Sequence, residues 1–286
     1  MKAPEFDYHR AESVAGALQA LRASGPEARL LAGGQSLLAT LNFRLSAPSI
    51  LIDIGRLDEL RGITETADGG LRIGALTTHA EIGRSAVIVR LAPMLTEGAP
   101  LIAHPAIRNR GTIGGSLALA DPASEWPACA LALQAEIEIA GLDGSRRVPA
   151  ADFFHGMYAT ACGADEMVAA LIVPPMAPGT RQSCCELARR HGDYALAGLA
   201  ITLAVTGGRV RDVRAAFFGV GPTPMLARRA AAAAEGLPPA EAAQAAAAAL
   251  AEDLDPQGDP VTDAATRLHL AGVLLRRTII RLGATA

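Results

Sequence analysis

Two glycine-containing segments hold the residues of this chain whose types and spacing could do chemistry. They are Leu31-Ala-Gly-Gly-Gln-Ser-Leu37 and Ile107-Arg-Asn-Arg-Gly-Thr-Ile-Gly-Gly-Ser116. Each places glycine backbone next to small hydroxyl residues, an arrangement that lets several peptide N–H groups approach a phosphate. The glycine pair alone is a weak signal, because roughly three adjacent pairs are expected by chance and the chain has four among its 29 glycines.

The neighbouring residues separate these two pairs from the other two. Gly33-Gly34 lies between an apolar run and a helix-like segment, a strand-to-helix junction where free N–H groups favour an anion. Gly114-Gly115 follows a run of cationic and amide side chains. By contrast, Gly69-Gly70 and Gly207-Gly208 lie between alternating apolar stretches and predict hairpin turns. Because two such sites can hold the two ends of one pyrophosphate, the pattern indicates a dinucleotide ligand.

Composition indicates a globular protein without a nucleic-acid or membrane role. The chain has 286 residues, 50% of them hydrophobic and 19% charged, and its net charge of −3 gives no basic field for nucleic acid or anionic lipid. Its longest uncharged apolar stretch, residues 195–205, is too short to span a bilayer. Acidic residues near the N-terminus and four cysteines without a Cys-x-x-Cys spacing favour a reduced, cytoplasmic location, with no metal or iron–sulfur site in this chain.

The chain divides at the proline-rich segment 173–179. We expect an N-terminal domain over 1–176, with lobes of about 1–57 and 58–176, and a C-terminal domain over 177–286. Periodicity in the first domain predicts helices at 11–22, 36–45, 78–95 and 125–133, with Thr78 as an N-cap, and strands at 30–31, 49–53, 71–76 and 136–140, the last followed by a hairpin turn at Asp143-Gly144. The second domain is predicted to be a small sheet, with strands at 197–205 and 210–220, backed by three helices at 224–234, 238–251 and 262–282.

Several common catalytic patterns are absent from the sequence. It has no Gly-x-Ser-x-Gly, no His-Glu-x-x-His and no phosphate-binding Gly-x-x-x-x-Gly-Lys pattern. Gly219-Val-Gly221 is a false dinucleotide signal, because the prolines that follow remove N–H donors. We therefore predict no catalytic residue and no metal ligand.

Five motifs in order along the chain carry a resemblance to a known family. They are Ala32–Ser36, Ile107–Ser116, Ala120–Ala123, Gly192–Gly198 and Leu268–Arg277. Together they resemble the FAD-binding medium subunit of the molybdenum hydroxylases, the family that includes xanthine dehydrogenase and carbon monoxide dehydrogenase. The resemblance implies an α+β fold, with a two-lobed FAD-binding domain of the vanillyl-alcohol-oxidase (PCMH) type, also found in the peptidoglycan precursor reductase, followed by a small C-terminal domain.

The resemblance also implies which residues contact the cofactor. The two glycine segments would wrap the FAD pyrophosphate and ribityl chain, with Glu125 on the ribityl hydroxyls and Asp121 in the same polar turn. Ile102 and Val168 would be apolar walls, and Tyr194 would stand over one isoalloxazine face unless it is only a sheet-edge tyrosine. The predicted cofactor-binding residues are Ala32, Gly33, Gly34, Gln35, Ser36, Leu37, Ile102, Thr112, Ile113, Gly114, Gly115, Ser116, Asp121, Glu125, Val168 and Tyr194.

The function that follows from the resemblance is electron transfer within a larger assembly. A molybdopterin-binding large subunit would oxidise the substrate, and a small subunit with two [2Fe-2S] clusters would pass electrons to FAD in this chain, in a dimer of heterotrimers. The chain departs from many relatives at Leu119, where they carry His or Asn, and in lacking a lysine before Asp193. A free-standing flavin reductase or oxidase and a nucleotide-sensing module without redox chemistry are the alternatives.

Overall fold

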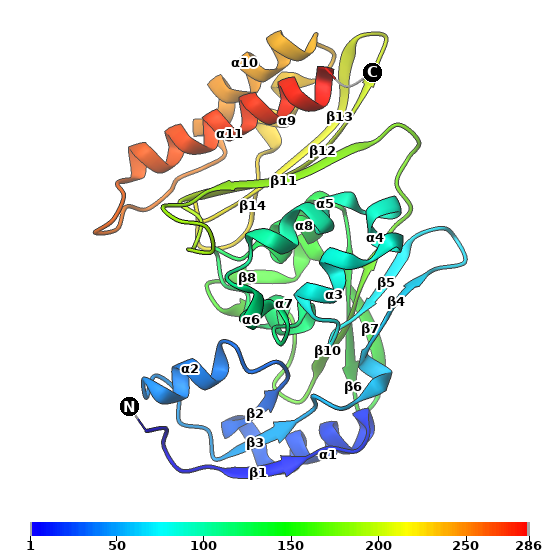
Figure 1. Ribbon diagram of the computed structural model, residues 1–286, viewed down its shortest axis with the longest axis vertical. Coiled ribbons are helices and arrows are strands. Elements are labelled where there is room, and N and C mark those ends of the chain that lie inside the picture. Colours follow the sequence, from blue (N-terminus) through cyan, green and yellow to red (C-terminus); the bar gives the residue numbers. More distant parts are fainter. Residues whose placement is uncertain (1, 285–286) are drawn as a thin grey trace.

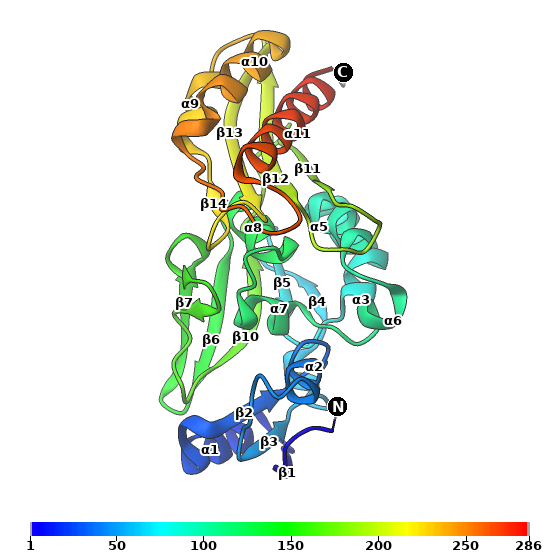
Figure 2. The same cartoon turned by 90° about the vertical axis from the view of Figure 1, so that its left-hand side faces the viewer.

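The molecule is a stack of three structural units along its long axis. The computed structural model describes residues 2–284. Figure 1 shows an N-terminal lobe at one end, a middle lobe, and a C-terminal unit at the other end. Figure 2 shows the same order after a 90° turn. Helices and sheets contribute to all three units, which confirms the predicted α+β fold.

The N-terminal lobe is a small parallel sheet with helices around it. Its strand order is β1-β3-β2, and both pairings are parallel. Ser13 caps α1 by accepting a hydrogen bond from the Gly16 N–H at 3.0 Å, and α1 buries Leu18 and Leu21. The elements are β1 (Asp7–Arg10), α1 (Val14–Ser24), β2 (Ala28–Leu31), α2 (Leu37–Asn42) and β3 (Ile50–Asp53). Strand β1 was not predicted, because all four of its side chains are exposed and no apolar alternation marks it.

The middle lobe is built on a five-stranded antiparallel sheet in the order β4-β5-β10-β6-β7. All seven residues of the central strand β10 are buried. The Thr66 N–H donates to the Gly70 carbonyl at 3.0 Å, so the predicted hairpin at Gly69-Gly70 is confirmed. The turn between β6 and β7 is made by Leu142 and Asp143, one residue earlier than expected.

The strands of the middle lobe are β4 (Ile63–Glu65), β5 (Leu71–Gly74), β6 (Glu136–Gly141), β7 (Gly144–Pro149) and β10 (Met167–Val173), with a separate pair of β8 (Phe154–Gly156) and β9 (Ala159–Thr160). Its helices are α3 (His79–Arg84), α4 (Ala86–Leu91), α5 (Pro93–Gly98), α6 (Pro105–Arg108), α7 (Ile113–Leu119) and α8 (Glu125–Ala132).

The single helix predicted over 78–95 is wrong, because the segment forms the three short helices α3, α4 and α5. The predicted cap is present: the Thr78 hydroxyl accepts from the Glu81 N–H, and the Glu81 carboxylate accepts from the Thr78 N–H at 2.7 Å. A second cap at Ser85 ends α3 and begins α4. Pro93 then opens α5, where its missing N–H costs nothing.

The C-terminal unit is a four-stranded antiparallel sheet, in the order β11-β12-β13-β14, covered by three helices as predicted. Gly207 and Gly208 both have positive φ, 58° and 72°, and form the two-residue turn between β12 and β13. The helix expected from residue 224 begins later, because Met225 and Leu226 pair with β13 as a short strand. The elements are β11 (Arg181–Leu187), β12 (Ala197–Thr206), β13 (Arg209–Phe218), β14 (Met225–Leu226), α9 (Arg228–Ala234), α10 (Pro239–Ala249) and α11 (Ala264–Ala284).

The C-terminal sheet packs against the middle lobe through α5 and α8. The Glu97 carboxylate on α5 accepts from the Ser183 hydroxyl at 2.7 Å and from the Cys184 N–H at 3.1 Å, both on β11. The Arg214 guanidinium on β13 donates to the Leu131 carbonyl on α8 at 3.2 Å. Phe218 belongs to the same buried cluster as the middle-lobe helices. These contacts hold the C-terminal sheet against the middle lobe.

Candidate functional site

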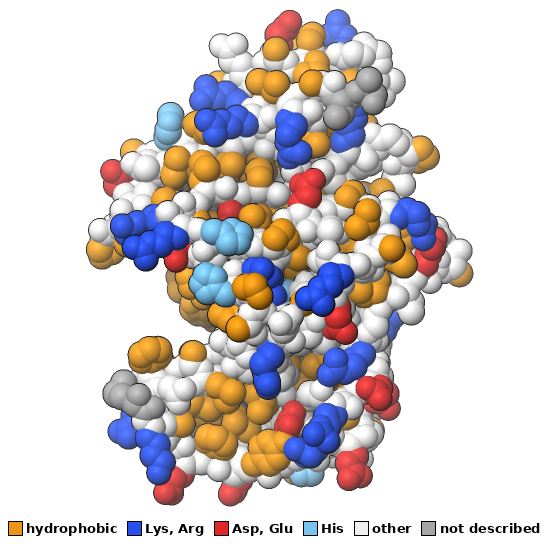
Figure 3. Space-filling view, in the orientation of Figure 1, with side chains coloured by type: hydrophobic (Ala, Val, Ile, Leu, Met, Phe, Trp, Pro, Cys, Tyr) orange, Lys and Arg blue, Asp and Glu red, His pale blue; other side chains and the backbone are white. Residues whose placement is uncertain are grey.

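One pocket of about 850 Å³ lies where the three units meet. In the space-filling view the molecule is notched between the N-terminal and middle lobes, near α2 and α6 (Figure 3). All the residues predicted from the sequence to bind a cofactor line this pocket, with the exception of Ile113. Ile113 is fully buried in the core of the middle lobe, so its side chain faces away from the pocket. The pocket is large enough for a drug-sized or larger ligand.

The first glycine segment offers a row of free backbone donors to the pocket. It joins β2 to α2, and Gly34 has a φ of +72° that favours glycine. Within residues 2–284, no protein group accepts a hydrogen bond from the backbone N–H groups of residues 33–37. Successive unpaired N–H groups of this kind form a concave anion site. This segment therefore supplies unpaired donors of the kind that phosphate binding needs.

The second glycine segment is different, and the expectation of a second turn with free donors is wrong. Gly114 and Gly115 lie in the first turn of α7. The four N–H groups here are already used: Ile113 donates to Thr77 O (3.0 Å), Gly114 to Ala75 O (2.9 Å), Gly115 to Thr112 Oγ1 (3.2 Å) and Ser116 to Thr112 O (3.1 Å).

Close packing explains the glycine at position 114. A Cβ atom there would lie 2.4 Å from the Ala75 Cβ, so only glycine lets α7 pack against the residue that follows strand β5. Gly115 has more room, since its nearest neighbour would be the Thr112 hydroxyl at 3.0 Å. What this segment presents to the pocket is α7 backbone and the Ser116 hydroxyl, which is hydrogen-bonded to the Ser124 hydroxyl at 2.6 Å.

The two glycine segments touch each other at one point. A Cβ atom on Gly33 would lie 2.0 Å from the Arg110 carbonyl oxygen, so the contact requires glycine. Arg108, which precedes this contact, donates to the carbonyls of Ile102 and Ala103 at 2.9 and 2.8 Å. Arg108 therefore supports the pocket wall that carries Ile102, and these hydrogen bonds use its Nη1 group. The exposed Arg110 adds positive charge beside the free donors.

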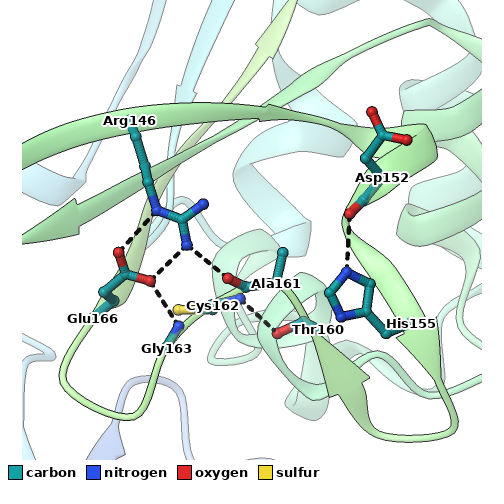
Figure 4. A network of polar contacts seen from close by, with 8 residues as sticks. All are labelled: Arg146, Asp152, His155, Thr160, Ala161, Cys162, Gly163 and Glu166. Atoms are coloured by element: carbon teal, nitrogen blue, oxygen red, sulfur yellow. Dashed lines mark hydrogen bonds and ion pairs between the residues drawn. The ribbon is translucent and has the colours of Figure 1, made fainter.

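The far end of the pocket is held by an ion pair that sequence reasoning missed. Arg146 on β7 and Glu166, just before β10, form a two-pronged pair, with Nε–Oε1 at 2.9 Å and Nη2–Oε2 at 2.7 Å (Figure 4). The Arg146 guanidinium also donates to the Ala161 carbonyl, and the Gly163 N–H donates to Glu166, both at 2.7 Å. This pair lowers the pKa of Glu166. It fixes the loop that leads into Val168, one of the predicted apolar walls.

The same loop carries Cys162, whose thiol is mostly buried. Burial and the nearby Glu166 raise its pKa to about 11. A thiol with such a pKa stays protonated near neutrality and is a poor nucleophile. Within residues 2–284, no group of three or more His, Cys, Asp or Glu side chains is placed to hold a metal ion, and no helix is long and apolar enough to cross a membrane.

Glu125 is recessed in the pocket wall at the start of α8. Burial, with repulsion from Glu186 and Asp121, raises its pKa from 4.5 to about 8. A carboxyl with this pKa is mostly protonated at neutral pH and can donate a hydrogen bond to a ligand hydroxyl. Glu186 on β11 lies behind it, and burial raises its pKa to about 7. Its Oε2 atom is buried without a hydrogen-bond partner.

His79 is a second buried pocket group that the sequence analysis did not single out. It is 6% exposed, and its Nδ1 accepts from the Trp126 indole N–H at 2.9 Å. Burial, and then the charge of Arg108, lower the pKa of His79 to about 4. The imidazole is therefore neutral near pH 7 and carries its proton on Nε2, next to Gly111. Only the fold could reveal it, because Trp126 is far away in sequence.

Tyr194 stands at the pocket rim, between β11 and β12. It is 73% exposed and lies three residues before β12 begins, so it is not a sheet-edge tyrosine. Gly192, with φ of +86°, packs against the Ala103 carbonyl, since a Cβ there would be 2.8 Å away. Burial, and then the charge of Asp121, raise the pKa of the Tyr194 phenol. An exposed ring at the mouth of a pocket is well placed to contact a planar ligand.

The other predicted residues complete the lining. The Asp121 carboxylate accepts from the Ala123 N–H at 2.9 Å, which fixes the turn before α8. Val168 is 5% exposed on β10, and Ile102 is half-buried across the pocket. Leu119, where a polar residue is frequent in the resembling family, also lines the pocket and makes this wall apolar.

Comparisons with known proteins agree with this geometry. Residues 4–176 match the family described as the FAD binding domain in molybdopterin dehydrogenase, and residues 182–282 match the CO dehydrogenase flavoprotein C-terminal domain. The chain is 38% identical over 283 residues to the carbon monoxide dehydrogenase medium chain of Afipia carboxidovorans, covering 98% of each. It is 42% identical over 231 residues to the alpha subunit of the 6-hydroxypseudooxynicotine dehydrogenase complex of Paenarthrobacter nicotinovorans, covering 80% of this chain and 78% of that one.

The fold is also similar to that of a solved structure. A chain of carbon monoxide dehydrogenase from Oligotropha carboxidovorans superposes with a TM-score of 0.96 and 36% identity, covering 100% of both chains. The matches define a flavoprotein class within the molybdenum-containing dehydrogenases, which are oxidoreductases. The chain belongs to the family of FAD-binding medium subunits of the carbon monoxide dehydrogenase type, and FAD is its cofactor.

Proposed function

We propose that the chain is an electron-transfer subunit, in which FAD receives electrons from an iron–sulfur partner and gives them to an external acceptor. The observation that carries the proposal is a pocket that combines free backbone donors at one end with an exposed aromatic ring at its mouth. When bound there, FAD supplies the redox chemistry. The protein positions and tunes it.

The residues have distinct roles in this proposal. The free N–H groups from Gly33 to Ser36 bind the pyrophosphate, and Arg110 adds a favourable charge. Glu125, protonated at neutral pH, donates to a ribityl hydroxyl. Ile102 and Val168 exclude water from the flavin, and Tyr194 covers one face of the isoalloxazine. Thr112 to Ser116 support the cofactor through α7 packing and the Ser116 hydroxyl, because the backbone donors of residues 113–116 are already paired.

The proposal extends to the domains and the assembly. The FAD-binding domain covers residues 1–176, with lobes of about 1–57 and 58–176, and the C-terminal domain covers 177–286. A molybdopterin-binding large subunit and a small subunit with two [2Fe-2S] clusters would complete a heterotrimer, and two heterotrimers would form a dimer. Support comes from the relatives, which are named as medium chains or subunits of dehydrogenase complexes.

A free-standing flavin reductase or oxidase is the second candidate, and one observation favours it. Such an enzyme needs a proton donor beside its substrate, and Glu125 is a protonated carboxyl in the pocket wall at neutral pH. Under this alternative Glu125 would face the substrate instead of the cofactor.

Anaerobic reduction experiments decide between the two. The chain would be expressed alone and together with the products of its neighbouring genes, and the flavin absorbance would be followed after adding heteroaromatic or aldehyde substrates. We expect reduction only in the co-expressed complex. Substrate-dependent bleaching of the flavin in the chain alone would reject the electron-transfer proposal in favour of the free-standing enzyme.

A further inference from the structure

The segment that carries Tyr194 packs against the middle lobe through Gly192 and the buried Ala195, but it makes few hydrogen bonds. Residues 188–196 connect β11 to β12 without regular structure. Inside this connection the Asp193 N–H donates to the Arg190 carbonyl at 3.1 Å, and the Leu196 N–H donates to the Leu187 carbonyl at 2.8 Å. Both bonds close the loop on itself. Neither bond ties the loop to the rest of the pocket rim.

The hydrogen bond that ties this segment to another part of the protein comes from Arg267, more than 70 residues further along the chain. Its Nη1 donates to the Leu196 carbonyl at 3.0 Å and to the Gly219 carbonyl at 2.6 Å. Its Nη2 forms an ion pair with Asp259, and the side chain is only 11% exposed. One guanidinium therefore binds two loop carbonyls and one carboxylate in a nearly buried site.

The position of Arg267 in its helix indicates that the loop contacts, and not the helix, require an arginine here. It lies in the first turn of α11, where the helix dipole disfavours a positive charge. Burying a guanidinium also costs free energy unless its donors are used. The Nε of Arg267 is buried without a partner. A cation at this position does not stabilise the helix, so the contacts of the guanidinium with the two loops explain why an arginine is buried here.

The second carbonyl that Arg267 binds leads to the other side of the rim. The Gly219 N–H donates to the Pro122 carbonyl at 2.9 Å, in the turn that carries Asp121. Gly219 has a φ of +74°, and a Cβ there would lie 2.7 Å from the Ala195 carbonyl oxygen. The Tyr194 loop, the Gly219 loop and the Asp121 turn are therefore in direct contact. Arg267 adds hydrogen bonds to the first two of these segments.

We propose that Arg267 is a positioning residue that fixes Tyr194 and the Asp121 turn at the pocket rim, so that the C-terminal unit sets how much of the flavin face is covered. The positioning itself holds in the empty protein. Its consequence for a flavin rests on the proposed function, in which Tyr194 covers the isoalloxazine. Arg267 contacts no ligand directly in this scheme, since it does not line the pocket.

Hydrogen–deuterium exchange of the cofactor-free chain tests the positioning. In Arg267→Met, which keeps an apolar stem of similar length, we expect amides in 193–197 and 219–221 to exchange about tenfold faster. Arg214→Met is the matched control, because Arg214 is also partly buried in the C-terminal unit, also has a buried Nε without a partner, and also donates to a distant carbonyl, but away from the pocket. It should leave exchange in both segments unchanged.

Two results would overturn the positioning role. Unchanged exchange in 193–197 in Arg267→Met would show that the loop holds itself. An equal increase in Arg214→Met would show a general loss of stability in the C-terminal unit. If Arg267→Met does not fold, Asp259→Asn provides the test, since it weakens the grip on the guanidinium and should raise exchange in the same two segments by a smaller factor.

Flavin fluorescence tests the consequence separately. With FAD added to the purified chain, Tyr194→Ala should raise the fluorescence, because stacked aromatic rings quench flavins, and Arg267→Met should raise it partly. Adding Arg267→Met to Tyr194→Ala should cause no further change if Arg267 acts through Tyr194. An additive effect would reject this route even where the exchange result holds. Failure of all variants and the parent to bind FAD would instead count against the proposed function.

Discussion

Replacing Glu125 with glutamine gives a sharp test of the pocket electrostatics. The folded chain holds the proton of Glu125 up to about pH 8, whereas the unfolded chain loses it near 4.5. Because the folded state binds the proton more tightly, stability falls as the pH rises from 4.5 to about 8. The shift corresponds to at most about 5 kcal/mol. Because the pocket opens to water, which screens the charge of the carboxylate, we expect a stability change of about half that size.

Glutamine has the shape of the protonated acid but cannot ionise. Cofactor-free Glu125→Gln should therefore match the parent chain at pH 5 and exceed its unfolding free energy by about 2 kcal/mol at pH 8 and above. Urea denaturation of both proteins at half-unit steps between pH 5 and 9 measures the difference. Glu241→Gln is the control, because Glu241 is also in the first turn of a helix but is exposed and remote from the pocket.

Two outcomes would refute this reasoning. A constant stability difference between pH 5 and 9 would mean that Glu125 is already ionised in the folded chain. A lower stability of the variant at every pH would mean that the carboxylate makes a favourable contact. FAD titration adds a separate readout: if the protonated acid donates to the ribityl chain, glutamine should keep affinity at pH 7 within about threefold, because its amide is also a donor.

The remaining predictions concern the cofactor and its neighbours. FAD should be bound without a covalent link, so acid precipitation should release it to the supernatant; flavin in the pellet, or FMN in its place, would contradict this. Gly33→Ala should lower both FAD content and thermal stability, because its Cβ would lie 2.0 Å from the Arg110 carbonyl oxygen, whereas Gly115→Ala, whose Cβ would lie 3.0 Å from the Thr112 hydroxyl, should be milder in both assays; the reverse order would contradict this reasoning. Tyr194→Ala should speed reoxidation of dithionite-reduced flavin in stopped flow and cost about 0.5–1.5 kcal/mol of FAD binding, and identical rates, spectra and affinity would remove Tyr194 from the site.

Local signals in the sequence predicted much of the fold. The glycine pairs at 69–70 and 207–208 mark hairpins correctly, and the Thr78 cap is present. The errors occur where tertiary contacts override local patterns. Strand β1 consists of exposed polar and charged side chains, and only its pairing with β3 makes it a strand. The helix expected over 78–95 breaks because Ser85 and Pro93 each start a new helix.

The site shows the same limit in more detail. Glycine segments and a polar turn could be recognised because each is contiguous in sequence, and the structure brings them to one pocket. The sequence could not show that the donors at Gly114 and Gly115 are already paired with Ala75 and Thr112, since this depends on how α7 packs. His79 and Glu186 were missed for a related reason. Each acquires its unusual pKa from burial, which no short motif reports.

The division of the pocket among three units has a consequence for the life of the subunit in the cell. The free donors belong to the N-terminal lobe, the apolar walls to the middle lobe and the Tyr194 rim to the C-terminal unit. A ligand bound across them joins all three and, at a hundredfold excess over its Kd, stabilises the folded chain by about 2.7 kcal/mol. We therefore expect chains that lack FAD to be degraded by proteases faster than chains that hold it.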